Sequence, residues 1–215
     1  MAVIQNAEGE VLFRSSHEEI GPCLEEAVKK GIPLTGADLR NADLEKVVLR
    51  GGHFHGANLE GARLVCADLR EAVLECARLN KAQLSCARLD RSNLKCADLE
   101  GAVFDGCELE SANLSGAFGT ADFTKADLTQ ADLSGVRMGT RGNGSRFNQA
   151  RLRECILEKG DFQNADFGEA FLVQANMREA NFQGANFRGA DLRGASLDRA
   201  QFPEFWLAEK YNVVW

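Results

Sequence analysis

Large apolar residues recur at every fifth position along most of the chain. Leu34, Leu39 and Leu44 begin a series that continues without a gap to Leu114. A small residue, most often alanine, stands two positions before nearly every one of these centres, and Ile32 is the one larger residue there. The pattern therefore predicts two inward positions in every five residues.

Neither ordinary secondary structure sustains this pattern. A helix repeats every 3.6 residues and a strand every 2, so either would spread the leucines over all of its faces. A chain that turns a corner in each five-residue unit, so that four units close one square coil, keeps every centre inside. Only a small side chain fits beside the stacked centres at the packing density of protein interiors.

The series shifts by one residue after Leu114. We interpret Phe118 as the next centre, and the pattern then continues through Phe123 to Met138. It resumes at Phe147 and ends at Phe202, so residues 34–202 carry the repeat.

The segment 139–146, between the two later series, contains three glycines. We expect a mobile, protruding loop there. Because functional loops often sit on rigid scaffolds, Arg141, Asn143 and Arg146 are candidate partner-binding residues. The alternative is a tolerated surface insertion with no binding role.

Individual units resemble the pentapeptide-repeat family, whose motif is Ala-(Asp/Asn)-Leu-X-X. Residues 37–41 (Ala-Asp-Leu-Arg-Asn) and 190–194 (Ala-Asp-Leu-Arg-Gly) are two examples. The resemblance implies the right-handed quadrilateral β-helix of that family, an all-β solenoid. With a spacing of roughly 4.8 Å per coil, about eight coils would form a rod on the order of 40 Å long. The family resemblance itself implies almost nothing about function.

Both ends of a solenoid need a cap, because they expose apolar surface and open strand edges. In residues 1–33, two short apolar runs predict a strand pair, and a helix follows that ends at Lys30 with Gly31 as its C-cap. Ser16 and Glu19 form a predicted capping box. Gly21-Pro22 offers an alternative, later start of the helix.

In residues 203–215, Pro203 predicts the start of a short C-terminal helix. The segment carries more apolar surface than a simple lid requires. Phe205, Trp206, Tyr211 and Trp215 are candidate contacts of a cap or of a dimer. The quinolone-resistance branch of the resembling family dimerises through its C-terminal end, so the protein is expected to be a monomer or a homodimer formed there.

The charged residues narrow the classes of partner. A net charge of −7 arises from 32 acidic and 25 basic residues that are spread along the chain. This mixed surface disfavours direct binding to nucleic acid.

The sequence also bears on where the protein resides. No apolar run approaches the ~18 residues of a membrane span. Seven cysteines, an odd number, with no visible leader predict a reducing, cytoplasmic setting.

Few residues offer catalytic chemistry. The three histidines, His17, His53 and His55, have no evident acid, base or nucleophile partner. A metal site of His53 or His55 with Glu75 would lack the four converging ligands of a closed zinc site. We therefore expect no catalytic residue, no cofactor and no metal.

Four cysteines fall at equivalent corners. The 20-residue coil would place Cys66 over Cys86 and Cys76 over Cys96, which gives two short sulfur ladders. They are either a redox or metal site, or compactly stacked, reduced thiols, and the second interpretation is preferred. Cys107 and Cys155 replace the inward alanine and should be buried.

These observations favour a non-enzymatic scaffold that binds a protein partner of unknown identity. Resemblance to the quinolone-resistance branch implies an alternative, a DNA-mimicking modulator of DNA gyrase or topoisomerase IV that gives fluoroquinolone protection. The N-terminal cap departs from that branch, and Arg178, Arg188, Arg193 and Arg199 interrupt the acidity. A second alternative is a thiol-based redox or metal-binding protein.

Overall fold

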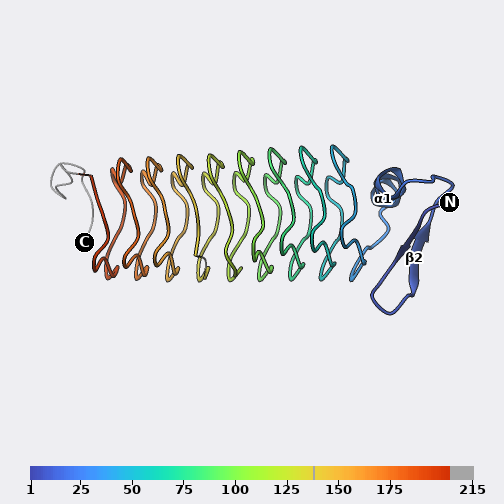
Figure 1. Cartoon of the computed structure of the whole chain (residues 1–215), viewed down its shortest axis with the longest axis horizontal. Coiled ribbons are helices and arrows are strands. Elements are labelled where there is room, and N and C mark those ends of the chain that lie inside the picture. The colour runs from blue at the N-terminus through green and yellow to red at the C-terminus, as the bar shows by residue number, and fades with distance from the viewer. Residues whose placement is uncertain (138, 204–215) are drawn as a thin grey trace.

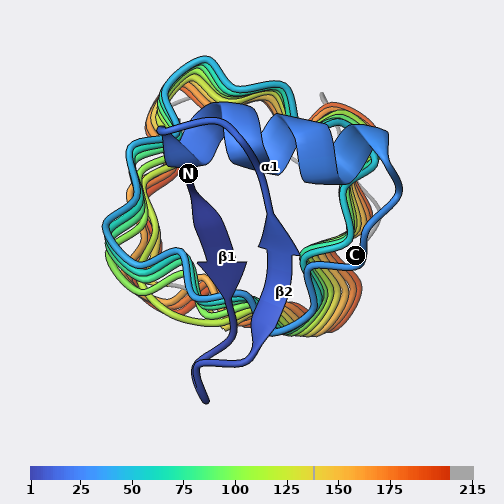
Figure 2. The same ribbon diagram turned by 90° about the vertical axis from the view of Figure 1, so that its right-hand side faces the viewer.

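The computed structural model describes residues 1–137 and 139–203. The chain begins with strands β1 (Val3–Gln5) and β2 (Val11–Arg14) and helix α1 (Ile20–Lys29). It then winds into a straight rod of stacked coils (Figure 1). Seen along the axis, each coil is a square, and the strand pair and α1 lie across its N-terminal end (Figure 2). The predicted right-handed β-helix is confirmed.

Neighbouring coils are joined through the residue directly before each centre, which we call the ladder position. Asp38 bridges Asn58 in parallel, and Asn58 bridges Arg78, so each coil takes 20 residues. Around each bridge the backbone groups pair between coils, as in Asn58 N–H to Ala37 C=O at 2.8 Å. The ladder side chains point outward, and each coil is held by its two neighbours.

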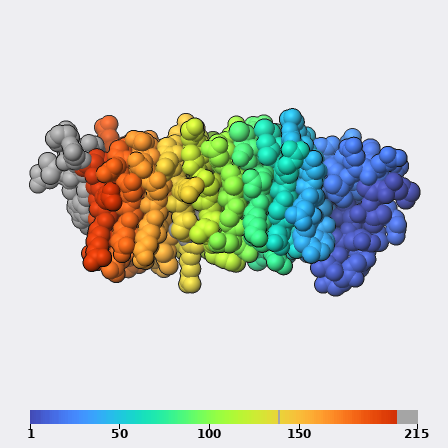
Figure 3. Space-filling model, in the orientation of Figure 1, coloured from blue at the N-terminus to red at the C-terminus, as the bar shows by residue number. Residues whose placement is uncertain are grey.

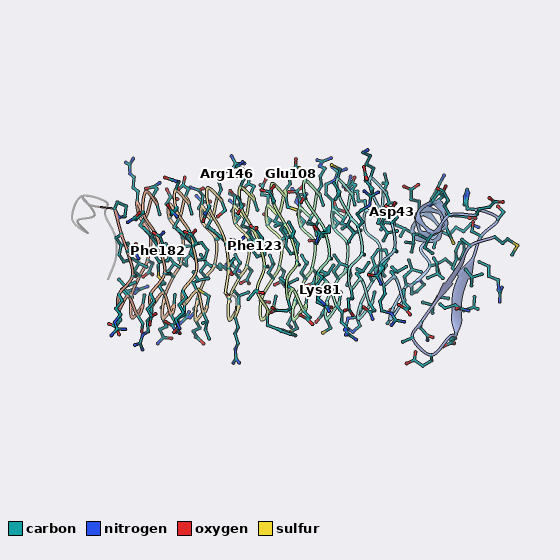
Figure 4. The ribbon with its side chains drawn as sticks, in the orientation of Figure 1. Asp43, Lys81, Glu108, Phe123, Arg146 and Phe182 are labelled. Carbon is teal, nitrogen blue, oxygen red and sulfur yellow. The ribbon has the colours of Figure 1, made fainter. Side chains whose placement is uncertain are left out.

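The centres and the small residues before them form a continuous core. Leu34 and Ala37 are fully buried, as are most of their counterparts along the rod. Leucines line most of the N-terminal half. In the C-terminal half phenylalanine rings stack from coil to coil, with centroids 4.8 Å apart for Phe147 and Phe167 and 5.0 Å for Phe167 and Phe187. Figure 4 shows Phe123 and Phe182 between the ribbon walls.

The prediction that Phe118 is a centre was wrong. Phe118 occupies a ladder position, where it bridges Asp98 and Arg137, and it is 46% exposed. Gly119 stands at the centre instead. A Cβ there would lie 2.5 Å from the Glu100 amide nitrogen, so the chain closes inward where the side chain is missing. The unit then omits one corner residue, and the bridges Val103–Asp122 and Phe118–Arg137 span 19 residues.

The predicted loop at 139–146 was also wrong, because this segment forms regular sides of a coil. Arg141 bridges Asp122 on one side and Asp161 on the other. Gly142 holds the centre, and its N–H donates to the Asp161 carbonyl at 2.7 Å. Ser145 is fully buried at the small inward position. The glycines serve the coil geometry here and do not create a protruding loop.

The N-terminal cap covers the open edge of the first coil. Gln5 C=O accepts from Asp38 N–H at 2.8 Å, and Glu25 Oε1 accepts from Val48 N–H at 2.8 Å. Pro33, at another ladder position of this edge, has no N–H to satisfy. The cap thus provides hydrogen-bond partners for the open edge and shields it from pairing with another chain.

The predicted strand pair and helix are present, and one local prediction failed. β1 and β2 pair antiparallel, and Gly31 has a positive φ of 68° directly after the C-cap Lys30. The expected Ser16–Glu19 capping box is absent, because α1 begins at Ile20 and its N-cap Glu19 makes no side-chain capping bond. The neighbouring residue Ser15 instead contacts the helix, because its hydroxyl group donates a hydrogen bond to the Glu26 carboxylate.

Candidate interaction surface

The ladder positions determine what the rod presents to a partner. Acidic and basic side chains stack on each other in successive coils, with Arg63 Nη2 2.9 Å from Asp43 Oδ2 and Arg88 Nε 2.8 Å from Glu108 Oε2. Such exposed pairs contribute about 0–1 kcal/mol each. Their main effect is that opposite charges neutralise each other along each side of the rod.

One coil departs from this alternation because all four of its ladder positions are arginines. We call Arg137, Arg141, Arg146 and Arg151 the arginine girdle, and all four are exposed. Because successive ladder residues lie on successive sides, the girdle places a guanidinium on every side of the rod. Side chains of the yellow coils project beyond the neighbouring outline in the middle of the rod (Figure 3).

The two neighbouring coils compensate the girdle on three sides. Arg141 lies between Asp122 and Asp161, and Arg146 between Asp127 and Asp166. Arg146 pairs with the Asp127 carboxylate, and Arg151 Nη1 lies 4.0 Å from Asp132 Oδ2. Figure 4 shows Arg146 and Glu108 on the same side of the rod.

On the fourth side Arg137 lies between two apolar residues. Its ladder neighbours are Phe118, 46% exposed, and Ile156, 37% exposed. Within the described residues, Arg137 takes part in no ion pair. This side therefore combines an unpaired cation with exposed apolar surface.

The corner beside Arg137 is recessed. The units of Phe118 and Arg137 each lack one corner residue, and they are stacked on each other, so that Gly139 comes to lie against Thr120. A groove of about 400 Å³ runs along this corner. Its lining includes Val103, Thr120, Asp122, Gly139 and Arg141.

A second groove lies on the side that carries Arg151. It has a volume of about 680 Å³ and is open to solvent along its length. Asp132, Arg151 and the half-exposed Phe171 line it, together with Gln130 and Gln149 from the adjacent corner. An open, shallow groove of this kind offers contact area to a macromolecule and does not enclose a small substrate.

Acidic residues gather just before the girdle in the sequence. The stretch 98–132 contains eight acidic side chains, and Lys125 is its one basic residue. The acidic residues are Asp98, Glu100, Asp105, Glu108, Glu110, Asp122, Asp127 and Asp132. They encircle the rod as an acidic belt, which ends where the girdle begins.

The partner-binding residues predicted from the sequence lie on a regular coil and not on a protruding loop. Arg141 and Arg146 belong to the girdle, on adjacent sides of one coil. Asn143 is half-buried at the following corner, where its Nδ2 donates to Asp161 Oδ2 at 3.1 Å. The other candidates, Phe205, Trp206, Tyr211 and Trp215, lie outside the described residues, as does the predicted short C-terminal helix.

The cysteines occupy the predicted places. Cys66, Cys76, Cys86 and Cys96 are exposed at corners, whereas Cys23, Cys107 and Cys155 are buried, and all seven are free thiols. Burial raises the pKa of the Cys107 thiol to about 12, and likewise that of Cys155. These two thiols stay protonated and inert.

His53 and His55 are exposed on either side of the buried Phe54, as expected. Across residues 1–137 and 139–203, the His, Cys, Asp and Glu side chains form no group of three or more that could hold a metal ion. The described part of the chain also contains no helix with the length and hydropathy of a membrane span.

Comparison with known proteins agrees with this architecture. The family profile of pentapeptide repeats matches in eight copies, over residues 34–64, 53–89, 82–118, 118–139, 139–167 and 161–199. A comparison with curated protein sequences found no significant match.

Two solved structures are similar along most of the rod. One is HetL, a pentapeptide-repeat protein involved in heterocyst differentiation regulation in the cyanobacterium Nostoc sp. strain PCC 7120. It is 26% identical with a TM-score of 0.64, and the match covers 89% of this chain and all of HetL. The other is a trypsin-treated form of QnrB1, a plasmid-mediated fluoroquinolone resistance protein. It is 17% identical with a TM-score of 0.60, over 86% of this chain and 92% of that one. With the repeat profile matched over most of its length, this chain belongs to the pentapeptide-repeat family.

Proposed function

We propose that the protein is a non-enzymatic scaffold that binds a protein partner at the middle of the rod. The observation that carries this proposal is the exposure of large apolar side chains at ladder positions in the two coils that flank the arginine girdle. Phe118, Ile156 and Phe171 are 46%, 37% and 50% exposed. Phe118 and Ile156 belong to one side of the rod and Phe171 to the adjacent side. Large exposed apolar residues gathered in one region are typical of interaction sites.

The residue types and the shape of the surface at the middle of the rod also support a binding role. Aromatic residues and arginine are enriched where binding energy concentrates in protein interfaces. The two grooves beside these residues are open, and their surroundings are rigid because the coils that form them are hydrogen-bonded to a coil on either side. A rigid surface loses little conformational entropy on binding.

The test compares the wild-type chain with the triple variant Phe118→Ser, Ile156→Ser, Phe171→Ser. Both would be immobilised and exposed to lysate of the source cells, with chemical cross-linking and mass spectrometry of the captured proteins. A discrete protein that cross-links to the wild type and is lost with the variant is the expected result. The proposal fails if both forms capture the same proteins, or if the purified chain turns over a substrate.

The second candidate function is modulation of DNA gyrase or topoisomerase IV by DNA mimicry. The acidic belt favours it, since a DNA mimic must present negative charge to a DNA-binding groove. The belt extends over only part of the rod, and the girdle then replaces it with positive charge. The similarity to QnrB1, at 17% identity, is one of fold and carries no function.

A gyrase supercoiling assay, with and without a fluoroquinolone, tests this candidate. Inhibition or drug protection at sub-micromolar protein, lost when the belt residues Glu108 and Asp127 are changed to Lys, would establish DNA mimicry. No effect at tens of micromolar would eliminate it and leave the general scaffold.

A further inference from the structure

We infer that Arg137, with Phe118 and Ile156 on either side, is the docking point for a partner segment that presents a carboxylate between two apolar side chains. This inference rests on the proposed scaffold function and specifies its site. We call the three residues the Arg137 triplet.

The triplet has the form of a linear recognition element. Its members are consecutive rungs of one ladder, because Phe118 bridges Arg137 and Arg137 bridges Ile156. With strands about 4.8 Å apart, the two apolar side chains flank the arginine within roughly 10 Å. A segment of a few residues spans that distance.

The charge of Arg137 sets the chemistry of the partner. Each of the other three girdle arginines has at least one aspartate as its ladder neighbour, and Arg146 and Arg151 form ion pairs. Arg137 has no acidic neighbour in its ladder and no ion pair among the described residues. Glu158, near Ile156 in sequence, instead accepts a hydrogen bond from Asn176 Nδ2 at 3.0 Å.

The apolar neighbours strengthen a charge pair at this position. A partner that covers Phe118 and Ile156 excludes water from around the guanidinium, and an ion pair is stronger in a medium of lower dielectric constant. The planar guanidinium can also bind a carboxylate with two parallel hydrogen bonds. A carboxylate flanked by apolar side chains therefore complements all three residues.

The recessed corner gives the partner access. Because two stacked units lack a corner residue, the groove beside the triplet is lined by the small residues Gly101, Ala102 and Gly139. Apolar contact with Val103 is available within the same groove. A partner segment that binds Arg137 can thus continue around this corner, over small residues, towards Asp122 and Arg141 on the next side.

The experiment uses the full chain and a phage-displayed library of random dodecapeptides as the probe. Peptides selected on the wild type are sequenced, and representative clones are resynthesised for fluorescence anisotropy. The variants are Arg137→Glu and Phe118→Ser. The matched control is Arg153→Glu, an exposed arginine at a corner of the same rod region. Circular dichroism and thermal melting confirm that each variant is folded.

We expect enriched peptides with Asp or Glu between large apolar residues. Their dissociation constants should rise at least about tenfold with Arg137→Glu and with Phe118→Ser, as at interface positions that dominate binding, and should be unchanged with Arg153→Glu. Peptides of this type whose affinity survives Arg137→Glu would overturn the inference while leaving the scaffold function intact. Failure to select any binding peptide would count against both.

Discussion

The ring of Phe162 fills the space that a side chain at Gly142 would occupy. A Cβ added at Gly142 would lie 2.6 Å from Phe162 Cδ1, well inside contact distance. The glycine in one coil and the large ring in the next are therefore a complementary pair. This relationship explains how a segment rich in glycine stays inside a tightly packed rod.

Replacing Gly142 with alanine should destabilise the protein. The added methyl group must displace a buried ring, and such overpacking costs about 1–3 kcal/mol. Urea unfolding followed by circular dichroism measures the change. The control is Gly139→Ala, where the new Cβ would meet Thr120 Cγ2 at an ordinary 3.4 Å. Combining Gly142→Ala with Phe162→Leu should recover part of the loss, and equal stability of Gly142→Ala and the wild type would contradict the pairing.

Truncation of two phenylalanines four positions apart should have very different effects on stability. Phe167 is fully buried and stacked between Phe147 and Phe187, whereas Phe171 is half exposed. Phe167→Ala should lower the free energy of unfolding by about 3–5 kcal/mol. Phe171→Ala should change it by no more than about 0.5 kcal/mol. A large loss for Phe171→Ala would show that this residue has a structural role.

The thiols should separate into two kinetic classes. Reaction of the native protein with a chromogenic disulfide reagent should modify Cys66, Cys76, Cys86 and Cys96 rapidly. Cys23, Cys107 and Cys155 are buried and should react only after denaturation. Peptide mapping after a short pulse of reagent identifies the modified residues. Rapid modification of Cys155 in the folded state would be incompatible with its position in the core.

Stability should fall at alkaline pH because of two buried thiols. Burial raises the pKa of Cys107 and of Cys155 from the usual 9.0 to about 12, so the folded state binds these protons more tightly than the unfolded state. Their contribution is fully present below pH 9 and is lost as the pH rises towards 12. Unfolding free energies at pH 8 and pH 10.5 test this. The double variant Cys107→Ala, Cys155→Ala should show a smaller decrease than the wild type, and an equal decrease would contradict the assignment.

The five-residue period was sufficient to predict the rod because every coil repeats the same environment. The period failed at Phe118, where the usual residue types are exchanged: the aromatic residue lies outside and Gly119 takes the centre. The true register was marked by Ala117 and Ala121, which are small inward residues only four positions apart. A search for large centres alone does not register that spacing.

The Arg137 triplet was hidden for a related reason. Phe118, Arg137 and Ile156 are separated by 19 residues, whereas the general repeat predicts neighbours 20 residues apart. The register of the coils had to be known before these side chains could be assigned to one side. Likewise, Arg141 and Arg146 stood out in the sequence as part of a loop, and their role in a ring of four arginines depends on the fold.

Gly119 and Gly142 are the two centres without a side chain in the described part of the rod. Since each coil of a solenoid contacts only its neighbours, the strength of the whole depends on its weakest junction. The two glycines lie in adjacent coils, on successive sides of the rod. Under a pulling force, we therefore expect the rod to separate first at these two coils, because each has one side chain fewer in the core.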